Sequence, residues 1–265
     1  MNLPRNLHEI PVPHGIRIHD RRDSVARWIL AAAMLATAPV EGLAQARARK
    51  QAAPARTATV NEPDAPAEKA KAGDAGAQAP NATIAPEDIR EFKTQPAGVR
   101  QLLEACLALA QRDLTYTYGS ADPAQGGMDC SGFVHYALRQ HGFAQVPRDA
   151  RGLYSWVRKA REFRAVVSRQ AESFEFDELL PGDLLFWTGT YAMEQDPPVT
   201  HVMIYLGTEK AGGGRIMIGS SDGRSYHGLK RNGVSVFDFT LPRAAQNGET
   251  RATFIGYARI PGLRD

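Results

Sequence analysis

Cysteine is scarce in this chain, which has only Cys106 and Cys130 among its 265 residues. A framework of several disulfides is therefore excluded, although one Cys106–Cys130 bridge or two free thiols stay open. A large excess of charge of one sign is also missing, because the formal net charge is only +3. The C-terminal half has no stripe of Lys and Arg and no nucleic-acid-binding signature, so we expect no nucleic-acid partner.

Long apolar runs are missing as well. The run Trp28–Val40 is shorter than the ~20 residues that span a bilayer. It follows several arginines and precedes small residues around Ala44, which is the order of a secretory signal. We predict a signal peptide over residues 1–44 and a periplasmic or secreted protein with no stable membrane span after cleavage. An uncleaved membrane anchor is the alternative.

Residues 45–95 are rich in Ala, Pro and charge, and Phe92 is their one aromatic residue. Such a stretch buries too little apolar surface to offset the entropy lost on ordering. The sequence therefore predicts a disordered tether over residues 45–95 and one folded domain over residues 97–265.

The folded domain begins with helical patterns and continues with strand patterns. Apolar residues recur at helical spacing over 99–111 and 129–141, where Asp129 is a good N-cap. Alternating or apolar runs bounded by Gly and Pro predict strands at 183–187, 201–206, 215–218, 234–239 and 254–260. Helices followed by an antiparallel meander indicate an α+β fold. Residues 143–180 fit neither pattern, and residues 188–199 are expected to form a loop.

Cys130 is the candidate nucleophile, because it opens the second predicted helix. The partial positive charge and free N–H groups of a helix N-terminus favour thiolate over thiol and could hold an oxyanion. A nucleophile also needs a base, and His201 opens a strand after a loop, as in papain-like Cys–His pairs. Cys106 lies within an apolar helical stripe and is assigned to the core. One Cys and one His without paired ligands fall short of a zinc site, so we expect no metal.

Four blocks together resemble the NlpC family, the NlpC/p-sixty cell-wall peptidases. The blocks are Tyr116-Thr117-Tyr118-Gly119, Met128-Asp129-Cys130-Ser131-Gly132-Phe133-Val134, Leu180-Pro181-Gly182-Asp183-Leu184 and His201-Val202-Met203-Ile204-Tyr205-Leu206-Gly207.

The resemblance implies a papain-like fold, with N-terminal helices packed on a central antiparallel sheet. It implies hydrolysis of peptidoglycan stem peptides, usually between D-γ-glutamate and a diamino acid. Cys130 would be the nucleophile, His201 the base, and Tyr116 the tyrosine whose hydroxyl lies near the sulfur. No cofactor is implied, and we expect a monomer.

The chain departs from the family pattern at the third catalytic position. The family usually has a polar residue there, often His, on the strand after the His201 strand, and Gly219 occupies that position here. We predict a replacement among the residues just downstream, which are Ser220, Ser221, Asp222 and His227, or a backbone carbonyl. The departure leaves two other interpretations open: an amidase or acyl transferase with the same Cys–His pair, and a non-catalytic peptidoglycan-binding module.

Overall fold

A computed structural model describes residues 78–241 and 252–265. The signal peptide predicted over residues 1–44, and residues 45–77 of the tether, lie outside these ranges. The described residues contain three α-helices: α1 (Ala97–Ala110), α2 (Cys130–Gln140) and α3 (Ala150–Lys159). None of the helices described is long and apolar enough to cross a membrane.

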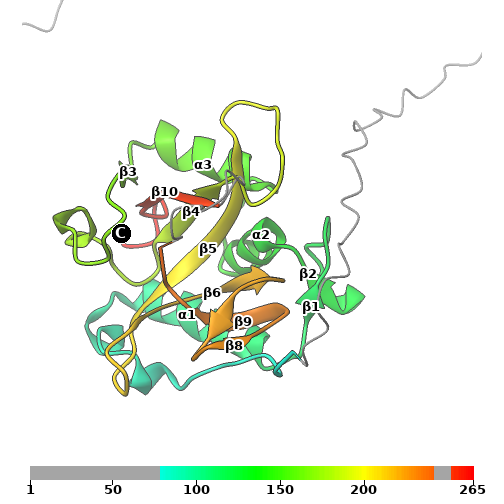
Figure 1. The fold of residues 1–265 in the computed structure, drawn as a ribbon, viewed down its shortest axis with the longest axis vertical. Helices are drawn as coiled ribbons and strands as arrows, with labels where there is room; N and C mark the ends of the chain where they lie inside the picture. The colour runs from blue at the N-terminus through cyan, green and yellow to red at the C-terminus, as the bar shows by residue number, and fades with distance from the viewer. Residues whose placement is uncertain (1–77, 242–251) are drawn as a thin grey trace, which may run out of the picture. The chain divides into compact units, whose positions relative to one another are not determined.

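The centre of the domain is an antiparallel sheet with the strand order β3-β10-β4-β5-β6-β9. The bounds of these strands are β3 (Phe163–Ala165), β4 (Leu184–Thr188), β5 (Val199–Thr208), β6 (Arg215–Ser221), β9 (Gly233–Asp238) and β10 (Thr253–Ala258). The short strands β1 (Thr115–Tyr116) and β2 (Gly127–Met128) pair with each other, as do β7 (Ser225–Tyr226) and β8 (Leu229–Lys230). Figure 1 shows the path of the chain through these elements.

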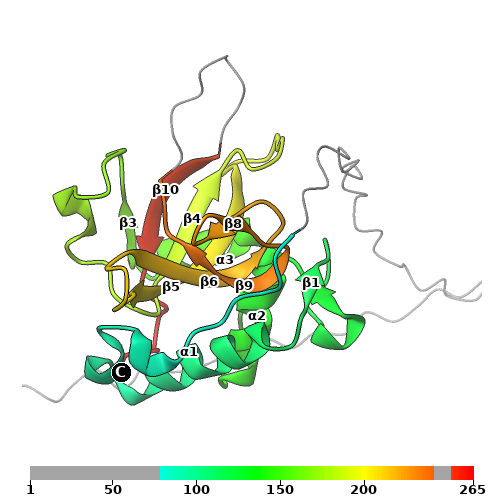
Figure 2. The same cartoon turned by 60° about the horizontal axis from the view of Figure 1, so that its bottom comes forward.

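Each face of the sheet carries its own apolar cluster, because side chains alternate along a strand. Val202, Ile204 and Leu206 of β5 pack with the helices, whereas Met203 and Tyr205 belong to a second cluster with Trp187. Figure 2 shows α1 and α2 along one side of strands β5, β6 and β9. The predicted α+β fold with helices packed on a central antiparallel sheet is thus confirmed.

The apolar stripe of α1 is buried as the spacing predicts, and Cys106 is completely buried within it. Both cysteines are free, so the thiols form no bridge with each other. The region that fitted no pattern, residues 143–180, contains α3, β3 and the 3₁₀ turn Phe174–Phe176. The predicted second helix begins at Cys130, and Asp129 caps it by accepting the Gly132 N–H at 2.6 Å.

Residues 78–95, expected to be part of the tether, instead pack against the domain. Ile89 is only 1% exposed, and the Glu91 carboxylate accepts the Thr208 N–H at 2.8 Å. The Ala82 carbonyl accepts the Val236 N–H from the edge strand β9, also at 2.8 Å. Further upstream, the Ala79 N–H donates to the Lys230 carbonyl. The prediction was wrong for this segment because a few apolar and hydrogen-bonding residues suffice to order a chain against an existing surface.

Candidate active site

The first turn of α2 places Cys130 against the start of β5. The Cys130 thiol donates to the carbonyl oxygen of Thr200, with an Sγ–O distance of 4.0 Å. The backbone N–H of Val202 also interacts with the sulfur. Because His201 lies between these two residues, the structure brings together the two residues that the sequence selected as nucleophile and base.

The close approach of the α2 N-terminus depends on Gly132. A Cβ built on this residue would lie 2.1 Å from the Ser120 carbonyl oxygen and 3.0 Å from the Ala121 Cα. Both are backbone atoms that cannot move aside cheaply. Gly132 therefore lets α2 sit close enough to the preceding loop to fix the position of Cys130.

Asp129 is surrounded by donors at this end of the helix. Its carboxylate accepts N–H groups from Gly119 and Gly132 and makes a two-point ion pair with Arg148, with N–O distances of 3.0 and 2.8 Å. Arg148 also donates to the Ser131 hydroxyl at 3.1 Å. This network ties the loop before α3 to the first turn of α2 and holds Cys130 between them.

The electrostatic surroundings of Cys130 differ from the sequence-based expectation. Burial is the largest influence and, with the Asp129 charge, it raises the pKa of the Cys130 thiol to about 12. The N–H groups of Val202 and Ser131 and the Arg148 charge act in the opposite direction without outweighing it. Cys130 is therefore a thiol at neutral pH, and the expected depressed pKa is not what this geometry gives.

His201 is 6% exposed and lies opposite Trp187 of β4 in the sheet register. The two rings meet edge to face, with centroids 5.7 Å apart. Burial first, and then the Arg224 charge, holds the pKa of His201 well below its usual range. Its Nε2 is buried and has no hydrogen-bond partner within residues 78–241 and 252–265. The resting imidazole is thus neutral and free to accept a proton.

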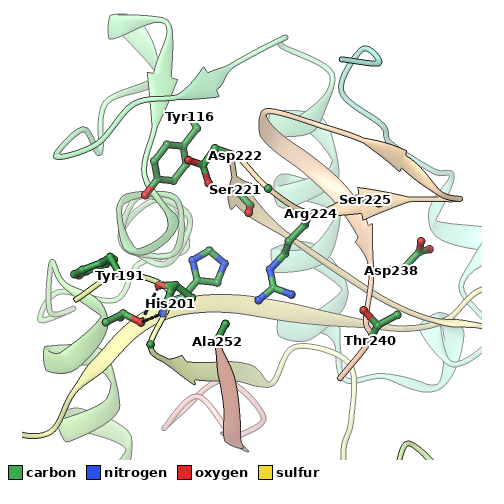
Figure 3. A pocket seen from close by; sticks show the side chains of 14 residues that line it. Tyr116, Tyr191, His201, Ser221, Asp222, Arg224, Ser225, Asp238, Thr240 and Ala252 are labelled. Carbon is green, nitrogen blue, oxygen red and sulfur yellow. Dashed lines mark hydrogen bonds between the residues drawn. The ribbon is translucent and has the colours of Figure 1, made fainter. Parts of the chain in front are cut away.

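A pocket of about 650 Å³ opens at His201 and is lined by residues of several strands and of the loops between them. Its lining includes the following residues: Tyr116, Thr190, Tyr191, Thr200, Ser221, Asp222, Arg224, Asp238 and Thr240. Figure 3 shows the Tyr116 ring and the His201 imidazole on the same side of this space. Hydrogen bonds from the N–H and hydroxyl of Thr190 to the Thr200 hydroxyl, at 3.0 and 2.8 Å, hold the loop after β4 onto the start of β5.

Two tyrosines lie close enough to Cys130 for its charge to affect them. Burial, followed by Cys130, raises the pKa of both Tyr116 and Tyr191, the latter to about 12. Tyr116 is thus near the sulfur, where the resemblance put it. Tyr191 comes from the loop over residues 188–199, which the sequence marked only as a loop.

The structure separates the four candidates for the third catalytic position. Ser220 is fully buried and donates to the Met128 carbonyl at 2.6 Å. Ser221 and Asp222 line the pocket. His227 does not line it, because its Nε2 lies 2.8 Å from the Glu209 carboxylate, and Glu209 follows the far end of β5 from His201.

The Gly219 position itself is filled by a neighbour. A Cβ on Gly219 would lie 2.9 Å from the Met203 Cε, so the Met203 side chain covers the place where a larger residue would stand. Met203 is on the same face of β5 as His201. An apolar side chain therefore stands where the family usually has a polar one.

Arg224 is the pocket residue that the sequence reasoning missed. Its guanidinium stacks on the Trp187 ring, 4.2 Å from the centroid, and its charge acts on both His201 and Cys130. Arg224 lies in the turn between β6 and β7, and only the fold shows that its side chain lines the pocket (Figure 3).

The arrangement suits acyl transfer through a neutral thiol–imidazole pair. The amide of Cys130, at the first helical position, has no acceptor within the helix and faces the same end as the sulfur. No three His, Cys, Asp or Glu side chains of the described ranges gather as a metal site.

One family model and one solved structure resemble parts of this chain. The model of the NlpC/P60 family matches residues 113–236, which include both Cys130 and His201. A crystal structure of a protein from Staphylococcus aureus, described as similar to lipoprotein and of the NLP/P60 family, is 20% identical, with a TM-score of 0.39. The match covers 71% of this chain and 44% of that protein, so this chain spans less than half of its length. No curated protein matches the sequence. Residues 113–236 of this chain thus match the NlpC/P60 family, whose proteins are generally cell-wall peptidases.

Proposed function

We propose that this protein is an exported cysteine peptidase that hydrolyses peptidoglycan stem peptides between D-γ-glutamate and the diamino acid. The observation that carries the proposal is the position of the Cys130 sulfur, 4.0 Å from the carbonyl oxygen of Thr200 and beside the backbone of His201, which lines a pocket. The match of residues 113–236 to a family of cell-wall peptidases supports peptidoglycan as the substrate.

In this mechanism the thiol proton passes to His201 as the sulfur attacks the scissile carbonyl carbon. The Cys130 amide and the Tyr116 hydroxyl donate to the oxygen that becomes negative. The C–N bond then breaks, and the leaving amine takes the proton from His201. A water molecule attacks the thioester and gives its proton to His201, the C–S bond breaks, and the sulfur recovers that proton.

The neutral resting pair has a consequence for this sequence of steps. Because burial raises the pKa of Cys130 and lowers that of His201, a stable thiolate–imidazolium pair is not formed beforehand. Proton transfer therefore accompanies attack, as in a serine hydrolase.

Incubation of the full chain with L-Ala–γ-D-Glu–diaminopimelate, followed by mass spectrometry, tests the proposal. We expect products cut after D-Glu with wild type and none with Cys130→Ala or His201→Ala, which should both keep the wild-type circular dichroism spectrum. Transfer of the acyl group to an added amine without hydrolysis would indicate an acyl transferase instead. A folded protein that binds the peptide without cutting or transferring it would indicate a binding module.

Export is a separate part of the proposal, supported by the basic, apolar and small-residue order of residues 1–44. Mass spectrometry of the protein recovered from the periplasm should show a chain shortened near Ala44. A full-length chain found only in the cytoplasm would contradict export but would not contradict the proposed peptidase activity.

A further inference from the structure

Arg224 differs from two other arginines of the domain, Arg148 and Arg259, in having no anionic partner among the described residues. Arg148 pairs with Asp129, and Arg259 pairs with Asp183. For Arg224, by contrast, no ion pair or side-chain hydrogen bond occurs among residues 78–241 and 252–265. Arg224 is half-buried in the pocket wall, and a charged group that is partly withdrawn from water without a partner costs free energy, so its retention needs a reason.

The guanidinium is still charged in this position. Burial lowers the pKa of Arg224 to about 10, which keeps the side chain protonated at neutral pH. The Trp187 ring below it supplies a cation–π contact, with 4.2 Å between the guanidinium carbon and the ring centroid. This contact occupies one face of the guanidinium and leaves its N–H edges available to a ligand.

The position of Arg224 relative to Cys130 and His201 restricts which ligands it could bind. Trp187 contacts both the Arg224 guanidinium and the His201 ring, and the Arg224 charge also acts on Cys130. The Arg224 guanidinium is therefore close enough to the sulfur for the two groups to influence each other electrostatically. Figure 3 shows that the His201 side chain comes from β5 and the Arg224 side chain from the turn after β6, and both line the pocket.

We propose that Arg224 binds the free α-carboxylate of the γ-linked glutamyl residue whose side-chain carbonyl Cys130 attacks. This inference rests on the proposed function and names the residue that recognises the acyl side of that substrate. A γ-linked glutamate keeps its α-carboxylate a few bonds from the scissile carbonyl, so one ligand could place the carboxylate near Arg224 and the carbonyl near Cys130, whose charges influence each other. A carboxylate and a guanidinium form two parallel hydrogen bonds, which a carboxamide cannot reproduce.

The assignment also gives Arg224 an effect on the base. While the pocket is empty, the Arg224 charge disfavours a proton on His201. A bound carboxylate neutralises that charge, so His201 becomes a stronger base when a substrate with the correct group is present. Arg224 is thus a specificity-determining residue that couples recognition to proton transfer.

The test compares two substrates that differ at one group: L-Ala–γ-D-Glu–diaminopimelate and the same peptide with the glutamyl α-carboxylate amidated. We expect full-length wild type to prefer the carboxylate by roughly 10- to 100-fold in kcat/KM. Arg224→Gln should lose this preference by slowing on the carboxylate peptide alone, while Arg224→Lys keeps part of it. Lys230→Gln is the control, because it removes an exposed charge from the hairpin that follows Arg224, outside the pocket.

Two kinetic outcomes would overturn the assignment. One is a wild-type enzyme that cuts both peptides equally well. The other is an Arg224→Gln variant that slows equally on both, which would indicate a general structural role.

Binding measured without catalysis keeps the two proposals distinguishable. Calorimetry of the full-length Cys130→Ala protein with L-Ala–γ-D-Glu should show binding that amidation or Arg224→Gln weakens by a similar factor. If amidation and Arg224→Gln both weaken this binding while wild type cuts neither peptide, the assignment of Arg224 as the carboxylate-binding residue stands and the peptidase proposal fails. If amidation leaves calorimetric binding unchanged, the assignment of Arg224 fails whatever the protein cleaves.

Discussion

The Cys130 thiol donates to the carbonyl oxygen of Thr200, the residue immediately before His201, across 4.0 Å. The nucleophile is therefore held by the backbone of the strand that carries its base. In the described part of the chain no hydrogen bond joins the thiol to the imidazole, whose Nε2 is unpartnered. Because Cys130 itself belongs to α2, a shift of β5 relative to α2 should change the separation of the two groups.

Alkylation of Cys130 by iodoacetamide should accelerate with pH without levelling off near neutrality. Because the pKa of the thiol is raised to about 12, the thiolate fraction grows about tenfold per pH unit between pH 7 and 10. Rates measured by mass spectrometry on native protein would check this, with Cys130→Ala giving the background from the buried Cys106. A plateau below pH 8 would mean that the thiol ionises readily after all.

Replacement of Arg224 by Gln should raise the pKa of His201. The Arg224 charge is the second cause of its depression, after burial, so the variant should move toward the usual range without reaching it. Nuclear magnetic resonance titration of the imidazole, in the Cys130→Ala background, measures the shift without relying on activity. Lys230→Gln should leave the titration unchanged, and an unchanged midpoint in Arg224→Gln would contradict the electrostatic contact.

Gly132→Ala should destabilise the domain by about 1–3 kcal/mol, because its Cβ would lie 2.1 Å from the Ser120 carbonyl oxygen. Gly214→Ala is the matched control, since a Cβ there would meet nothing within 4 Å. Urea unfolding of both variants gives the comparison. Equal stability of the two would show that the first turn of α2 has room to move.

Arg259→Met should lower the free energy of unfolding by about 3–5 kcal/mol, because it leaves the Asp183 carboxylate buried without its cation. Adding Asp183→Asn should recover part of that loss. The exposed pair Arg164–Glu178 provides the contrast, and Arg164→Met should cost less than about 1 kcal/mol. Thermal or urea unfolding measures all three, and a harmless Arg259→Met would disprove the importance of this buried pair.

His227→Ala should cleave stem peptides within about twofold of the wild-type kcat/KM. Its imidazole contacts Glu209 beyond the far end of β5, and its side chain is 58% exposed. Steady-state kinetics alongside His201→Ala would separate the two histidines. A loss of tenfold or more in a stably folded variant would restore His227 as the third catalytic residue.

Much of the fold follows from local pattern. The apolar stripe of α1, the Asp129 cap of α2 and the strand runs on each side of His201 are set by residues near one another in sequence. The packing of residues 78–95 was missed because it depends on contacts with β5 and β9, far along the chain. A composition poor in aromatics does not reveal such contacts.

In the candidate site, too, some features follow from local sequence and others only from contacts between distant residues. Cys130 and His201 could be selected from their places at the starts of a helix and a strand. The direction of the Cys130 pKa could not, because burial and the Asp129 charge outweigh the helix terminus. Arg224 was overlooked because its partner ring, Trp187, is brought to it only by the folded sheet.

The point where the chain enters the domain has a mechanical consequence. The Ala79 N–H donates to the Lys230 carbonyl of β8, and the Arg231 side chain donates to the Pro80 carbonyl. The hairpin fastened in this way follows directly on the loop that carries Arg224. A force applied to the chain from the N-terminal side would therefore act on this hairpin before it acts on any helix. The pocket wall that carries Arg224 would be the first part of the site to experience that force.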